Sequence, residues 1–148
     1  MHYTQILYGS PEYDASLRLR YRVLREPLHL DYTIEQIEAE FDSIHLAGFD
    51  DQEQMVAALV LHQIRPEPVF KMRQVCVEPD LQAKGIGTAL VEFAEKKAKL
   101  LGYERITLHA RDVSIPFYEK LGYQKLGDPF IEVGIQHHEM EKSLVTMI

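Results

Sequence analysis

One stretch, residues 75–90, constrains this chain more than any other. It reads as the end of a strand, a short polar loop and, from Gly85, a strongly helical segment. Backbone N–H groups at the start of a helix have no partner within the helix, and the helix dipole places positive charge there. Glycines at 85 and 87 let the backbone approach a ligand closely. The stretch therefore predicts an anion site, and phosphate is the anion that such sites commonly hold.

Two better-known phosphate motifs do not fit this loop. A P-loop needs Gly-x4-Gly-Lys-Ser/Thr, a spacing that the segment lacks. A Rossmann fingerprint needs a third small residue where Leu90 stands, and its first glycine directly after the strand. Here eight residues, 78–85, lie between Val77 and Ile86. The remaining alternative is a loop whose glycines only permit a tight turn.

Size and composition predict a single domain over residues 1–148. The 148 residues are 46% hydrophobic and 26% charged, which is ordinary for a globular domain. No apolar run approaches the roughly 18 residues of a membrane span, and the N-terminus lacks the features of a signal peptide. Cys76 is the only cysteine, so a cytoplasmic location is expected. The net charge of −7 argues against nucleic acid as a partner and mildly favours a cationic acceptor such as an amine.

Hydrophobic periodicity and turn residues predict an α+β fold. The expected strands cover residues 3–8, 44–49, 55–64, 69–77, 105–110, 123–126 and 134–144. The expected helices cover residues 14–26, 33–40, 85–101 and 115–121. This order predicts a mixed, largely antiparallel central sheet of six to seven strands flanked by about four helices, with one βαβ unit across residues 69–110.

The first two helices carry recognisable start signals. Asp14 or Ser16 can cap the first one, whose apolar spacing predicts a buried face of Leu17, Tyr21 and Leu24. Thr33 followed by Gln36 is the pattern of a capping box. The second helix has little apolar content and is therefore expected at the surface.

Two motifs resemble those of the GNAT superfamily of acyl-CoA-dependent N-acyltransferases. Gln82-x-x-Gly85-x-Gly87 after a strand end is similar to the superfamily's motif A, and the Phe-Tyr-Glu-Lys-Leu-Gly-Tyr run at 117–123 resembles its later motif at the matching separation. The order of elements also agrees, so the resemblance covers nearly the whole chain. More finely, residues 40–46 and 130–140 are similar to the ElaA-like group, which usually has a proline where this chain has Gln136.

The resemblance implies that acetyl-CoA is the cosubstrate and that no metal is needed. The pyrophosphate would lie on the backbone of the loop residues Gln82, Ala83, Lys84, Gly85, Ile86, Gly87 and Thr88. The Lys84 side chain would add positive charge, although a solvated lysine explains it equally well. The pantetheine arm would pair with the strand edge at Val75, Cys76 and Val77, which could also stabilise the oxyanion.

The same resemblance implies direct attack of a neutral amine on the thioester in a ternary complex. Tyr118 stands at the superfamily's usual general-acid position, and core packing is its alternative role. Some members use a glutamate as base where this chain has Lys71, so the base is sought among His137, Glu132 and His45. The acceptor would be a small amine or a protein amino group. The alternative is a non-catalytic acyl-CoA-binding module, and the sequence leaves open whether the chain forms the homodimer common in such proteins.

Three further features point away from other chemistry. His137 and His138 are neighbours on an expected strand and would face opposite sides, which suits no shared metal. Cys76 lacks the surrounding signature of a nucleophile, so a structural thiol is expected. Arg111 and Asp112 stand near the place where superfamily members often have a CoA-contacting asparagine, and that contact is not carried over to this chain.

Overall fold

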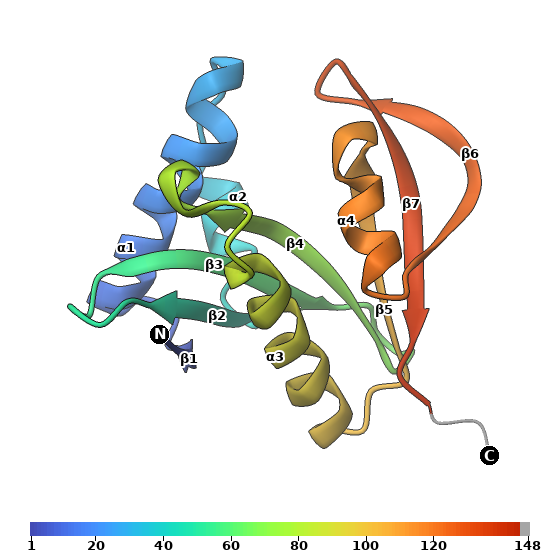
Figure 1. Cartoon of the computed structure of the whole chain (residues 1–148), viewed down its shortest axis with the longest axis horizontal. Helices are drawn as coiled ribbons and strands as arrows, with labels where there is room; N and C mark the ends of the chain where they lie inside the picture. The colour runs from blue at the N-terminus through green and yellow to red at the C-terminus, as the bar shows by residue number, and fades with distance from the viewer. Residues whose placement is uncertain (146–148) are drawn as a thin grey trace. The chain divides into compact units, whose positions relative to one another are not determined.

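The computed structural model describes residues 1–145 and divides into two compact units (Figure 1). Unit 1 comprises Met1–His62 and Met72–Lys96, and unit 2 comprises Gln63–Lys71 and the chain from Lys97 onward. The strands form one seven-stranded sheet in the order β1-β2-β3-β4-β5-β7-β6. β4 and β5 are parallel, whereas β5–β7 and β6–β7 are antiparallel. The predicted mixed sheet, with its βαβ unit, is confirmed.

The strands of unit 1 form its core. They are β1 (His2–Ile6), β2 (Ile44–Phe49), β3 (Met55–Gln63) and the later part of β4 (Val69–Val77). β1, β2 and β3 pair antiparallel in sequence order. The central residues of β2 and β3 are buried without interruption, over residues 45–48 and 56–61, and include Leu46, Leu59 and Leu61. Burial without alternation indicates that both faces of these strands are covered.

The first helix, α1 (Pro11–Arg20), starts earlier than predicted. Its N-cap is Ser10, whose hydroxyl accepts a hydrogen bond from the Tyr13 N–H at 3.1 Å, and Pro11 occupies the first turn. The caps expected at Asp14 and Ser16 are therefore wrong. A serine with non-helical dihedrals followed by proline is a strong start signal, and it outweighs the weaker caps inside the helix.

The buried face of this segment also differs from the prediction. A π-helix, Tyr21–Arg25, and a short 3₁₀ turn, Glu26–Leu28, follow α1. The buried residues of α1 are Tyr13, Ser16, Leu19 and Arg20. Leu17, Tyr21 and Leu24 are only partly buried. A π turn has a different residue spacing from an α turn, so a face extrapolated across it at α-helical spacing is displaced.

The second helix, α2 (Ile34–Glu38), begins with the predicted capping box. The Thr33 hydroxyl accepts from the Gln36 N–H at 3.1 Å, and the Gln36 side chain accepts from the Thr33 N–H at 2.9 Å. No residue of α2 is fully buried. The short length of α2 agrees with its surface position, because little burial supports it.

Unit 2 contains the remaining elements. These are the end of α3 (Ile86–Leu100), β5 (Arg105–Arg111), α4 (Ile115–Lys120), β6 (Gln124–Glu132) and β7 (Ile135–Ser143). β6 has nine residues, whereas the predicted strand covered only residues 123–126. The strand is longer because the sheet continues through a register shift between Leu126 and Phe130. Within residues 1–145, no helix is long and apolar enough to cross a membrane.

The two faces of β5 have different roles. Ile106, Leu108 and Ala110 are buried, whereas His109 and Arg111 alternate with them and are only partly buried. Side chains of directly paired strand residues share a face. The face of β5 that carries His109 and Arg111 therefore continues onto β7 and β6, and we call it the polar face of unit 2.

Candidate functional site

The predicted phosphate loop lies between β4 and α3 in unit 1. A 3₁₀ turn, Pro79–Leu81, follows β4, and residues 82–85 are exposed. The Ala89 N–H donates to the Gly85 carbonyl at 3.0 Å, which starts the hydrogen-bond ladder of α3. The N–H groups of residues 86–88 precede that ladder, so they are available to a ligand.

The loop backbone is shaped for close approach. Ala83 has φ 66° and Gly85 has φ 83°, both in the left-handed region. Such residues, next to right-handed ones, turn successive N–H groups toward one side and create an anion-binding concavity. A Cβ at Gly85 would meet no heavy atom within 4 Å, so the space beside this glycine is open. The geometry of unit 1 thus agrees with an anion site at the predicted place.

The strand before this loop contains a residue in the left-handed region. Gln74 has φ 58° in the middle of β4, a strained conformation for a non-glycine residue. The Tyr32 hydroxyl donates a hydrogen bond to the Gln74 side-chain oxygen. The Arg25 guanidinium lies 4.5 Å from the centre of the Tyr32 ring. These contacts surround Gln74, which immediately precedes the candidate cofactor edge at residues 75–77.

Cys76 has the environment of a structural thiol. It is 4% exposed and packs in a cluster with Leu19 and Ala58. Burial raises the pKa of the Cys76 thiol to about 12, so the thiolate is scarce at neutral pH.

On the neighbouring segment, Arg22 pairs with Glu78 at 2.5 Å, just after β4.

His45, one of the candidate bases, belongs to a buried network. Its side chain donates through Nε2 to the Glu40 carbonyl at 2.9 Å, and the residue is 2% exposed. The Glu40 carboxylate accepts from both Arg20 terminal nitrogens at 3.0 and 2.6 Å and from the Tyr13 hydroxyl at 2.7 Å. The other ring nitrogen, Nδ1, is buried and has no hydrogen-bond partner among the described residues. The burial of His45 in this network favours a structural role, and its role as a base stays a prediction.

This network makes stability depend on pH. Burial disfavours ionisation of Glu40, but the hydrogen bonds and charge of Arg20 outweigh it and hold the Glu40 pKa below its ordinary 4.5. The stabilisation that the ionised Glu40 carboxylate gives the folded state is fully present above pH 4.5. It is lost as the pH falls through the lowered pKa of Glu40. Burial lowers the pKa of His45 below 6.5, so below that pH the unfolded chain binds a proton that the folded chain resists.

We therefore expect the urea midpoint of unfolding to fall steadily between pH 7 and pH 4, as followed by circular dichroism. Glu40→Gln removes the titrating carboxylate. The urea midpoint of this variant should therefore decline less between pH 5 and pH 4 than that of the unmodified protein. Equal midpoints of the unmodified protein at pH 7 and pH 4 would contradict the expectation.

Tyr118 occupies α4 in unit 2. It is 8% exposed and packs edge-on against the rings of Phe117 at 4.9 Å and Tyr123 at 5.7 Å. Burial raises the pKa of its phenol well above the ordinary value of 10. The phenol is therefore neutral at pH 7 and can act as a hydrogen-bond donor. Ring packing and proton donation are compatible roles for this residue.

The other two catalytic candidates lie together on the polar face of unit 2. His137 Nε2 is 3.7 Å from a Glu132 carboxylate oxygen, and His137 Nδ1 donates to the Ile135 carbonyl at 2.7 Å. That bond fixes the tautomer of the neutral imidazole and leaves Nε2 able to accept a proton. The other Glu132 oxygen is 3.3 Å from His109 Nδ1. His109 has no local sequence signal as a site residue, and only the β5–β7 register brings it to this face.

His138 lies on the opposite face from His137, as expected. Its ring nitrogen is 3.4 Å from Asp112, which also accepts from the Gln136 amide at 2.8 Å. Among residues 1–145, no group of three or more His, Cys, Asp or Glu side chains is placed to hold a metal ion.

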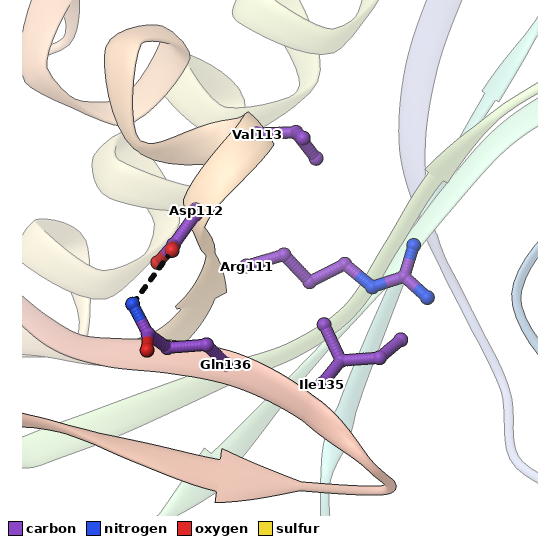
Figure 2. A pocket seen from close by; sticks show the side chains of 5 residues that line it. All are labelled: Arg111, Asp112, Val113, Ile135 and Gln136. Atoms are coloured by element: carbon purple, nitrogen blue, oxygen red, sulfur yellow. Dashed lines mark hydrogen bonds between the residues drawn. The ribbon is translucent and has the colours of Figure 1, made fainter.

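A pocket of about 310 Å³ opens at the end of β5 (Figure 2). Its lining residues are Arg111, Asp112, Val113, Ile135 and Gln136. This pocket was not predicted from the sequence, although the Arg111-Asp112 pair stood out there. The pairing of Arg111 with His137 brings together the two chain segments that line it.

Comparison with known proteins identifies relatives over most of the chain. Residues 26–144 match the family described as the acetyltransferase (GNAT) domain. The uncharacterized N-acetyltransferase YitI of Bacillus subtilis is 29% identical over 142 residues, covering 90% of this chain and 93% of YitI.

Solved structures share the fold at lower identity. A Lactobacillus plantarum protein assigned to the N-acetyltransferases has a TM-score of 0.84 at 22% identity, covering 98% of this chain and 100% of that one. An aminoglycoside 6′-N-acetyltransferase in complex with coenzyme A has a TM-score of 0.81 at 19% identity, covering 100% and 99%. Escherichia coli ElaA has a TM-score of 0.82 at 18% identity, covering 95% and 98%. At these identities the likeness is one of fold.

Proposed function

Because this chain belongs to the GNAT acetyltransferase family, we propose that it transfers an acetyl group from acetyl-CoA to a primary amine of a small molecule or protein. The amine would attack the thioester directly in a ternary complex. The match over residues 26–144 includes segments of both compact units, which supports one acetyltransferase domain over residues 1–148. We also propose that the protein is cytoplasmic, as expected from the sequence.

The observation that carries the proposal is the exposed loop at residues 82–85 followed by the first turn of α3. Its left-handed residues and free N–H groups support binding of the CoA pyrophosphate by residues 82–88. The edge of β4 at residues 75–77, just after Gln74, would pair with the pantetheine arm.

Unit 2 would supply the proton-transfer groups. Tyr118, whose phenol is neutral at pH 7, would donate a proton or a hydrogen bond to the departing CoA thiolate. His137, with Nε2 free to accept, would take the proton from the amine, and Glu132 would stabilise the imidazolium that forms. The roles proposed for Tyr118, His137 and Glu132 each rest on contacts of that side chain within unit 2.

Isothermal titration of the purified protein with acetyl-CoA tests the cosubstrate directly. Saturable binding of acetyl-CoA, with none of NAD or ATP, is the expected result. A protein that binds none of the three would refute the cosubstrate assignment, and a subsequent screen of amine acceptors would lose its basis.

Gly85→Glu is expected to weaken acetyl-CoA binding on the order of 30-fold, because a carboxylate would occupy the open side of the phosphate loop. Gly102→Glu is the matched control. Both glycines have φ 83° and open space around a Cβ, so both substitutions impose the same backbone strain. Gly102 follows the opposite end of α3, so that variant should keep full affinity. Equal affinities of the two variants would remove the loop from the cofactor site.

A further inference from the structure

Arg111 carries a positive charge that no acidic side chain of residues 1–145 neutralises in an ion pair. It is the last residue of β5 and is only partly exposed. Exposed arginines such as Arg18 and Arg73 are solvated by water. The other arginine of the strand, Arg105, pairs with two glutamates. A guanidinium has five N–H donors and no acceptor, so a partly buried one without a carboxylate is suited to an external anion.

The pocket around Arg111 leaves that charge accessible. Figure 2 shows the guanidinium extending between Val113 and Ile135, whereas Asp112 turns to the other side, toward the Gln136 amide at 2.8 Å. The Asp112 carboxylate is therefore engaged elsewhere, although it is the next residue in the chain. The pocket presents N–H donors beside two branched apolar side chains.

This combination fits a carboxylate attached to an apolar body. A guanidinium binds a carboxylate through two parallel hydrogen bonds, and that geometry selects for planar anions. Val113 is 85% exposed, so it has apolar surface to bury against methylene groups. The pocket volume of about 310 Å³ is that of a small-molecule site.

The pocket also adjoins the candidate base. Arg111 is paired with His137 across β5 and β7, so their side chains share one face of the sheet. A molecule held by its carboxylate at Arg111 would keep an amine of its own near the imidazole. The carboxylate would thus position the nucleophile, which is a contribution to rate as well as to affinity.

We propose that the acceptor is an amine that also carries a carboxylate, and that Arg111 binds this carboxylate between Val113 and Ile135. The inference rests on the proposed acetyl transfer and specifies its substrate class. A phosphate of CoA has similar anionic chemistry, so the experiment distinguishes an acceptor carboxylate from the cosubstrate.

The first arm measures binding without turnover. Hexanoate has a carboxylate and an apolar chain but no amine, and its titration is followed through the methyl NMR resonances of Val113 and Ile135. We expect saturable shifts that Arg111→Gln weakens about tenfold. Arg105→Gln removes a guanidinium from the same strand and face, and it should bind hexanoate as the unmodified protein does. Hexanoate binding that Arg111→Gln leaves intact overturns the proposal.

The second arm measures CoA release with 6-aminohexanoate and hexylamine, which share an amine and differ in the carboxylate. The unmodified protein and Arg105→Gln should prefer 6-aminohexanoate about tenfold in kcat/KM, and Arg111→Gln should reduce that ratio to about one. Equal use of both amines by the unmodified protein overturns the inference while acetyl transfer stands. If the protein transfers acetyl to neither amine, the acetyl-transfer proposal is overturned. The acceptor assignment is then overturned with it, even if hexanoate binds. A tenfold loss of acetyl-CoA affinity in Arg111→Gln would assign the guanidinium to the cosubstrate and also overturn the inference.

Discussion

Glu40→Ala is expected to lower the free energy of unfolding by about 3–5 kcal/mol, because it leaves the buried Arg20 charge without its carboxylate. Only 1% of the Arg20 side chain is exposed, and both of its terminal nitrogens donate to Glu40. The same substitution removes the acceptor of the Tyr13 hydroxyl. Arg20 Nε already lacks a partner among the described residues, so few alternatives remain for the guanidinium. Chemical denaturation at pH 7 measures the change.

Arg22→Ala is the matched control for this substitution. It removes another arginine–glutamate pair, Arg22 with Glu78 at 2.5 Å, but 53% of the Arg22 side chain is exposed. An exposed pair contributes only about 0–1 kcal/mol, since water solvates both partners once they separate. The expected difference between the two variants therefore comes from burial. Similar losses in both would show that burial of Arg20 does not control the energetics of its pair.

The strand end, loop and helix start over residues 75–90 could be predicted from sequence because their determinants are local. A strand end, a loop and a glycine-marked helix start are all read within residues 75–90. The bounds of α3 and β4 followed from the same short-range pattern, and both lie within one residue of the prediction. Local dihedral preferences and periodicity are sufficient at such a site.

The polar face of unit 2 could not be predicted in this way. His109 reaches Glu132 only through the pairing of β5 with β7 and of β7 with β6. The register of β6 changes between Leu126 and Phe130, and a shift of one residue moves a strand's side chains to the other face. The predicted strand ended at residue 126, whereas β6 continues to Glu132. Long-range register thus determined both the Glu132 cluster and the Arg111 pocket.

The prediction of the buried face of α1 was wrong for a different reason. Arg20 is fully buried, although arginine is among the residues least often found in a core. Its burial depends on Glu40, which is twenty residues later in the chain, and no local pattern links the two. The π-helix after α1 adds to the error because it changes the spacing of the side chains that follow.

Tyr118→Phe should lower kcat on the order of 100-fold, about 2.7 kcal/mol of transition-state stabilisation, while acetyl-CoA affinity stays unchanged. Phenylalanine preserves the ring contacts with Phe117 and Tyr123 and removes only the hydroxyl. A hydroxyl that hydrogen-bonds the departing thiolate acts in the transition state, so its loss changes kcat rather than binding. Steady-state kinetics with an accepted amine, together with calorimetric titration of acetyl-CoA, measures both quantities.

Tyr103→Phe is the appropriate control for the loss of a phenol hydroxyl. The Tyr103 ring stacks on Phe70 with centroids 3.7 Å apart, so that substitution also preserves ring packing. It should leave kcat within about twofold of the unmodified protein, since a surface hydroxyl contributes little. A Tyr118→Phe variant with full turnover would reduce Tyr118 to a packing residue. A protein that binds acetyl-CoA but transfers acetyl to no amine would instead favour the non-catalytic acyl-CoA-binding module, because binding at the proposed loop of residues 82–88 would not require a proton donor.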